Sequence, residues 1–156
     1  MSTAYLNIGS NIGDRMALIE RAVAAVVARV PRCVCRVSTP VESEPWGYDS
    51  ANRYINVGVA LEHVDLTPLE LLRECRAVER TISPASHRDA AGGYADRMID
   101  IDLIAFDDVV MDCPELTLPH PRMHLRDFVL LPQAELAPMW MHPMFRLTAA
   151  ELLERL

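Results

Sequence analysis

The stretch "YADRMIDIDLIAF", residues 94–106, places two carboxylates inside an apolar run. Asp100 and Asp102 alternate with Ile99 and Ile101, a pattern that predicts a β-strand with one buried face. Because side chains two residues apart in a strand point to the same side, the carboxylates project together, about 7 Å apart. Two such charges repel each other unless a positive charge compensates them. Two interpretations remain open: a magnesium site, since Mg²⁺ prefers oxygen ligands, or a solvent-exposed strand face paired with an arginine.

The segments around this stretch predict an α+β fold. Thr67 is a good N-cap, with Pro68 in the first helical position and Glu70 completing a capping box. Residues 39–52 are rich in turn formers and are expected to form a loop. The predicted strands are residues 4–8, 33–38, 54–64 and 98–106, and the predicted helices are residues 15–29 and 68–82. The order is the ferredoxin-like βαββαβ alternation, an antiparallel sheet with helices on one face.

The chain, residues 1–156, is expected to form a single domain. Its hydrophobic content of 51% is enough to bury a core at this length. After the last strand of the alternation comes a C-terminal extension, in which "VVMD" and "LTL" predict a short strand pair. Thr148 is the expected cap of a terminal helix.

Charge and composition limit the partners. The net charge of −7 argues against binding to a nucleic-acid backbone, and no apolar run is long enough to cross a bilayer. All 15 basic residues are arginines, so an anionic substrate would be held by a few convergent guanidinium groups. We therefore expect a cytoplasmic monomer that acts on small molecules. The 4 cysteines are expected to be reduced packing residues.

Five segments in order resemble one enzyme family. They are "YLNIGSNIGDR", "EPWGYDSANRYINVGVALE", "TPLELLRECRAVER", "DRMIDIDLIAFDD" and "LTLPHPRMHLRDFVLLPQAELAP", which together extend from Tyr5 to Pro138. Their spacing is similar to that of 6-hydroxymethyl-7,8-dihydropterin pyrophosphokinase of folate biosynthesis. The resemblance implies a ferredoxin-like fold and transfer of the terminal pyrophosphate of ATP to the hydroxymethyl group of a reduced pterin, with release of AMP.

The resemblance also implies a nucleotide site. Asp100 and Asp102 match the paired aspartates that hold two Mg²⁺ ions against the phosphates of ATP, the co-substrate. The implied catalytic residues are Arg88, Arg97, Asp100 and Asp102, and the implied ATP-binding residues are Glu79, Arg88, Arg97, His120 and Arg126. Arg97, His120 and Arg126 are expected as phosphate-facing cations, and Arg88 as a mobile arginine in a long loop. Three of these residues have a structural alternative: Arg97 pairs with a neighbouring aspartate, His120 fills a turn, and Glu79 is a solubilising helix residue.

On the pterin side, the resemblance implies a flat apolar slot with polar groups at its edge. The implied pterin-binding residues are Ser43, Pro45, Trp46, Asn56 and Phe128. Phe128 matches the stacking aromatic, and Asn56 matches the amide that binds the pterin edge. A structural hydrogen bond at Asn56 and a core position for Phe128 are the alternatives. Gly9 is expected to permit a tight turn after the first strand.

Two departures from the family pattern leave a second function open. Tyr94-Ala95-Asp96-Arg97 stands where the family commonly has Trp-Gly-Pro-Arg, and Trp46 replaces an aliphatic residue. The second hypothesis is a small-ligand binding module that keeps the pterin slot and has lost transfer chemistry. The presence of both aspartates, His120 and Arg126 argues against that loss.

Overall fold

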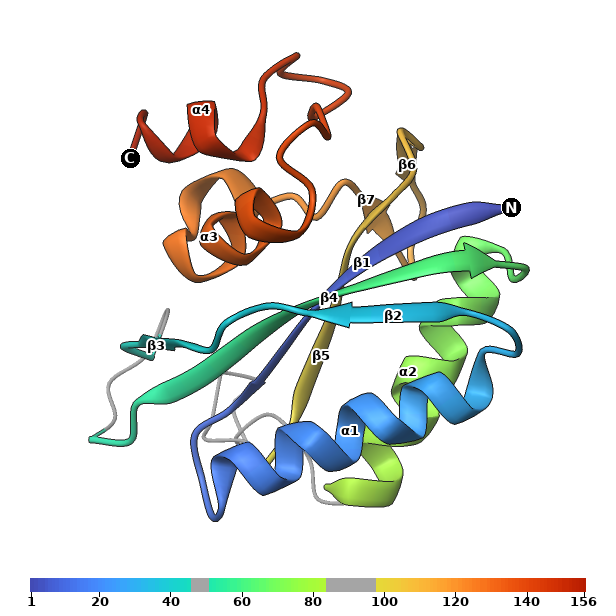
Figure 1. Ribbon diagram of the computed structural model, residues 1–156, viewed down its shortest axis with the longest axis vertical. Helices are drawn as coiled ribbons and strands as arrows, with labels where there is room; N and C mark the ends of the chain where they lie inside the picture. Colours follow the sequence, from blue (N-terminus) through green and yellow to red (C-terminus); the bar gives the residue numbers. More distant parts are fainter. Residues whose placement is uncertain (46–50, 84–97) are drawn as a thin grey trace.

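The computed structural model describes residues 1–45, 51–83 and 98–156 (Figure 1). Its elements are β1 (Ser2–Ser10), α1 (Arg15–Arg29), β2 (Val34–Val37), β3 (Val41–Ser43), β4 (Tyr54–Val64), α2 (Pro68–Ile82), β5 (Asp100–Phe106), β6 (Met111–Asp112), β7 (Thr117–Leu118), the 3₁₀ helix η1 (Met123–Leu125), α3 (Asp127–Leu136) and α4 (Ala149–Leu153). The predicted α+β, ferredoxin-like fold is confirmed. The two long helices have the predicted bounds, and Thr67 and Thr148 form the capping boxes of α2 and α4. Within the described ranges, each helix falls short of the length and apolarity needed to cross a membrane.

The main sheet is antiparallel and has the strand order β2-β4-β1-β5. β1 is a central strand, and its residue Gly9 lies opposite Asn56 of β4 on one side and Asp100 of β5 on the other. The expectation of a loop throughout residues 39–52 is wrong for Val41–Ser43, which form β3 and pair with β4. β4 has 11 residues, and the 4 residues of β2 pair only with its second half. The first residues of β4, Tyr54 to Asn56, pair with β3 instead.

Helices α1 and α2 cover one face of the sheet, as predicted, and their apolar side chains pack on Ile8, Val57 and Ile101. The C-terminal extension folds onto the opposite face, where α3 and α4 pack on Tyr5 and Ala60 (Figure 1). Alternation along the strands directs Asp100 and Asp102 away from the α1–α2 core. Both carboxylates therefore lie on the face that α3 partly covers.

Helix α3 was not among the predicted helices, and its proline explains why. Pro132 lies inside the helix and has no N–H to donate to the carbonyl of Phe128, four residues earlier. The side-chain amide of Asn7 on β1 donates to that carbonyl instead, at 3.0 Å. Gly58 on β4 lets the proline approach, because a Cβ atom at Gly58 would stand 2.5 Å from the Cβ of Pro132. The sheet therefore supplies both the missing hydrogen bond and the space that α3 requires.

Asn7→Ala is expected to lower the free energy of unfolding by about 1–3 kcal/mol, because the Phe128 carbonyl loses its donor. In a Pro132→Ala background the loss is expected to be smaller, since residue 132 regains an N–H that can serve the same carbonyl. Urea denaturation of the wild type, both single variants and the double variant measures the difference. An equal cost in both backgrounds would contradict this account of α3.

Candidate active site

Arg126 lies against the carboxylate face of β5. Its Nη1 atom is 3.8 Å from Oδ2 of Asp102, and its side chain is only 10% exposed. Its guanidinium carbon stands 5.7 Å from the centre of the Phe128 ring, within the range of a cation–π contact. The N-terminal end of α3 therefore brings a cation to Asp102 and an aromatic ring to that cation; the family resemblance assigns the first to the phosphate side and the second to the pterin side.

His120 reaches the same site from the segment after β7. Its backbone N–H donates to the carbonyl of Ile104 on β5 at 2.8 Å, and its Nδ1 accepts from the N–H of Arg122 at 3.2 Å. Burial, followed by the nearby charge of Arg126, lowers the pKa of His120 from 6.5 to about 4. Because Nδ1 accepts, the neutral ring carries its proton on Nε2. His120, which was expected as a cation, is therefore a neutral hydrogen-bond donor in the ligand-free protein. Its Nδ1 bond to Arg122 also places it in a turn, the structural alternative considered for this residue.

Three of the residues expected on the pterin side lie on two paired strands or next to them: Ser43 on β3, Pro45 just after it, and Asn56 on β4. Asn56 is 3% exposed, and its Nδ2 donates to Oγ of Ser43 at 2.8 Å and to the carbonyl of Val41 at 3.3 Å. The structural hydrogen bond considered for Asn56 is thus present, through its nitrogen. Pro45 is half-buried just beyond β3.

Gly9 has a different role from the one expected. It lies within β1, not in a turn, and a Cβ atom there would stand 2.8 Å from Oδ1 of Asn56. Glycine therefore allows the Asn56 oxygen to lie over the central strand, on the side toward Asp100. Sequence reasoning missed this because the role depends on which residues of the neighbouring strands face Gly9.

Glu79 is a buried residue of α2, 5% exposed, so the solubilising alternative is wrong. Its Oε2 accepts from the backbone N–H of Ile101 at 2.8 Å, and its Oε1 accepts from Nη1 of Arg76. Arg76 also donates to the Ile101 carbonyl at 3.0 Å. Sequence reasoning missed Arg76, although its spacing of three residues from Glu79 on a helix is a signal for an ion pair.

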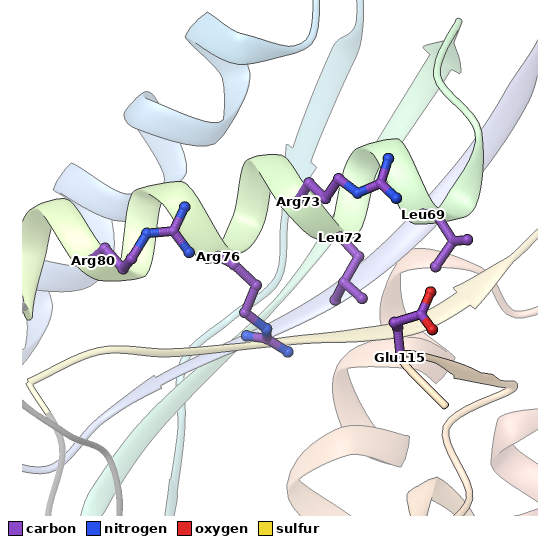
Figure 2. Close-up of a pocket in the computed structure, with 6 residues that line it drawn as sticks. All are labelled: Leu69, Leu72, Arg73, Arg76, Arg80 and Glu115. Atoms are coloured by element: carbon purple, nitrogen blue, oxygen red, sulfur yellow. The ribbon is translucent and has the colours of Figure 1, made fainter. Parts of the chain in front are cut away.

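A hollow beside β5 adds a second group of residues that the sequence did not indicate. Its volume is about 360 Å³, and it is lined by Leu69, Leu72, Arg73, Arg76, Arg80 and Glu115. Figure 2 shows the three arginines along one side of α2, with Arg76 extending to β5 and Glu115 facing the helix from the β6–β7 segment. The hollow thus combines apolar side chains with guanidinium donors next to the aspartate strand.

Trp46, Arg88 and Arg97 lie outside the described residues. Within residues 1–45, 51–83 and 98–156, no group of three or more histidine, cysteine or acidic side chains is placed to hold a metal ion. The Asp100–Asp102 pair fits Mg²⁺ nevertheless, because Mg²⁺ in phosphate-transfer sites takes one or two carboxylates and completes its shell with water and substrate phosphates.

Comparison with known proteins identifies the family of this chain. The model of the 7,8-dihydro-6-hydroxymethylpterin-pyrophosphokinase (HPPK) family matches residues 5–138. The chain belongs to this family. A 2-amino-4-hydroxy-6-hydroxymethyldihydropteridine pyrophosphokinase of Porphyromonas gingivalis is 40% identical over 144 residues, which cover 92% of this chain and 95% of the relative. The Bacillus subtilis pyrophosphokinase is 34% identical over 133 residues, 85% of this chain and 77% of the relative.

Solved structures support the fold. A Plasmodium falciparum HPPK-DHPS chain superposes with a TM-score of 0.75 and covers 99% of this chain at 14% identity. This chain spans only 43% of that longer chain, so the likeness concerns the fold of the HPPK-like part alone. The family model and the curated relatives identify this HPPK-family chain as a pyrophosphokinase of folate biosynthesis.

The imidazole of His120 is expected to stay neutral in the ligand-free HPPK until the pH approaches about 4. The unfolded chain takes up this proton near pH 6.5, so the neutral state of His120 contributes fully to stability above that pH. The contribution falls as the pH drops from 6.5 to 4, because protonation then favours the unfolded chain. NMR titration of the His120 ring protons measures the pKa, and a midpoint near 6.5 would contradict the burial argument.

Proposed function

We propose that this HPPK transfers the pyrophosphate of ATP to 6-hydroxymethyl-7,8-dihydropterin across the surface above Gly9 and releases AMP. The observation that carries the proposal is the register of three strands. Asn56, Gly9 and Asp100 occupy one row of the sheet. Two strand spacings separate Asn56 from Asp100 by roughly 10 Å, about the length of a pterin ring with its hydroxymethyl arm. A ring bound at Asn56 can therefore direct that arm to phosphates held at the aspartates.

On the nucleotide side, Asp100 and Asp102 are the residues that would hold Mg²⁺ against the phosphates. When bound there, Mg²⁺ neutralises charge on the phosphoryl oxygens and makes the β-phosphorus easier to attack. The Nε2–H of His120 and the guanidinium of Arg126 would donate to phosphate oxygens. The hollow along α2 lies next to the same strand, and its apolar wall and arginines suit the base and ribose of ATP.

On the pterin side, Asn56 is oriented by its own bonds. Because its nitrogen is bound to β3, its oxygen is left to accept from the amino group of the pterin. Phe128 supplies a ring for stacking, and Arg126 beside it links the two halves of the site.

In the transfer step the pterin hydroxyl oxygen forms a bond to the β-phosphorus while the bond between that phosphorus and the α–β bridging oxygen breaks. AMP leaves with the bridging oxygen, and the hydroxyl proton passes to solvent. The residues at this site position both substrates and stabilise charge on the phosphoryl oxygens, which is the main requirement of phosphoryl-type transfer.

Asp102→Asn is expected to reduce AMP formation by at least ~100-fold, because the amide keeps the shape of the carboxylate and loses the charge that binds the metal. Circular dichroism is expected to show an unchanged fold. Asp108→Asn, the same change at an exposed position after β5, serves as the matched control. Near wild-type AMP formation by Asp102→Asn, with an unchanged magnesium requirement, would overturn the assignment of the nucleotide side.

Asn56→Ala is expected to weaken pterin binding by about 1–3 kcal/mol, because the pterin edge loses its acceptor, while ATP binding stays near that of the wild type. Ser43→Ala removes a partner of the Asn56 nitrogen but keeps the oxygen, so its effect on pterin binding is expected to be smaller. Calorimetric titration of each variant with pterin and with ATP measures the two affinities separately. Equal weakening of pterin and ATP binding in Asn56→Ala would contradict the pterin role.

A further inference from the structure

Ile101 lies between the two aspartates, and its backbone N–H and carbonyl point away from β1, beyond the edge of the sheet. Among the residues that the structure describes, β5 is the last strand in the order β2-β4-β1-β5, so no described strand pairs with its outer edge at Ile101. The N–H of Ile101 donates to Glu79 at 2.8 Å, and its carbonyl accepts from Arg76 at 3.0 Å. Two side chains of α2 thus supply the donor and the acceptor that a further strand would otherwise supply at this position.

The two side chains are also bonded to each other. Nη1 of Arg76 donates to Oε1 of Glu79, which closes a ring of hydrogen bonds with Ile101. Burial lowers the pKa of Arg76, but the charge and hydrogen bond of Glu79, with smaller contributions from Asp102 and Asp100, outweigh burial and raise that pKa above its usual value. Arg76 is therefore a permanent cation whose charge is felt by both aspartates.

On its other side, β5 pairs with β1 in regular register at Asp100, Ile101 and Asp102, and the pairing becomes irregular just after Leu103. The pairing of β1 with β5 shifts register between Tyr5 and Leu6, opposite the stretch that follows Asp102. A register shift of this kind bends a strand and interrupts its ladder of hydrogen bonds. The aspartate segment therefore ends close to an irregular part of the ladder, and side chains of α2 bond the outer edge of β5 at Ile101.

We propose that Arg76 and Glu79 are positioning residues, which clamp Ile101 so that the carboxylates of Asp100 and Asp102 keep the separation that the metal requires. Mg²⁺ demands nearly ideal octahedral geometry with short metal–oxygen distances, so small movements of the strand weaken its binding. The proposal rests on the proposed function of the aspartate pair. The proposal also gives Glu79 a different role from the ATP contact that the family resemblance implies, because its two carboxylate oxygens already accept from Arg76 and Ile101.

Glu79→Gln tests the clamp. The Gln oxygen can still accept from Ile101, but its NH₂ group then faces the guanidinium of Arg76, donor against donor, and the ring opens. The concentration of Mg²⁺ that gives half-maximal AMP formation is expected to rise by about 10–100-fold, as for other residues that orient metal ligands. The KM for pterin and the affinity for ATP without metal are expected to stay near wild type. Glu74→Gln, the same change on α2 at a residue bonded to Arg29, is the matched control.

A second readout needs neither activity nor metal. Amide hydrogen exchange at Ile101 is expected to accelerate in metal-free Glu79→Gln and to remain slow in Glu74→Gln. If Glu79→Gln does not fold, Arg76→Met tests the clamp through the magnesium response, because it frees the Ile101 carbonyl and leaves Glu79 bonded to the Ile101 N–H. Arg76 also lines the hollow assigned to ATP, so Arg76→Lys, which keeps a cation there, is the reference variant and is expected to recover part of the wild-type magnesium response.

An unchanged magnesium requirement together with weaker metal-free ATP binding would overturn the clamp and make Glu79 a nucleotide ligand. Unchanged exchange at Ile101 would overturn it as well. Failure of the wild type to form AMP is a different result, since it refutes the proposed function while the exchange experiment still decides whether the clamp exists.

Discussion

The register of β4, β1 and β5 at Gly9 is the constraint on which the rest of the site depends. Ile8, Val57 and Ile101 point into the α1–α2 core, and their burial determines how the three strands align. A slip of one residue would turn the aspartates toward that core, so the apolar face also determines the position of the polar one. Asn56 and Asp100 thereby flank Gly9 without any direct contact between their side chains being required.

The second half of the site depends on how α3 docks on this sheet. Its proline leaves a carbonyl without a helical donor, and Asn7 supplies one from the strand that carries Gly9. Gly58 gives the proline room, and the N-terminal end of the helix then presents Arg126 next to Asp102, with the Phe128 ring beside Arg126. The C-terminal extension is therefore a structural part of the proposed active site, and the family match also extends beyond the βαββαβ unit, to residue 138.

Local signals made much of the fold predictable. The capping box at Thr67 and the alternation of β4 depend on neighbouring residues, and both were predicted with the observed bounds. α3 and β3 were not predicted, because a proline-containing helix and a three-residue strand form only when the sheet supplies their partners. The face of Asp100 and Asp102 followed from strand periodicity. The roles of Gly9, Arg76 and buried Glu79 did not, since each depends on a residue distant in the sequence.

The most direct measurement is the identity of the nucleotide product when the wild-type protein is incubated with ATP, Mg²⁺ and 6-hydroxymethyl-7,8-dihydropterin. If phosphates at Asp100 and Asp102 meet a pterin held at Asn56, phosphorus NMR will show AMP and a pterin diphosphate forming in equal amounts, and neither will form without Mg²⁺ or without pterin. Formation of ADP, or of AMP with free pyrophosphate in the absence of pterin, would contradict the account.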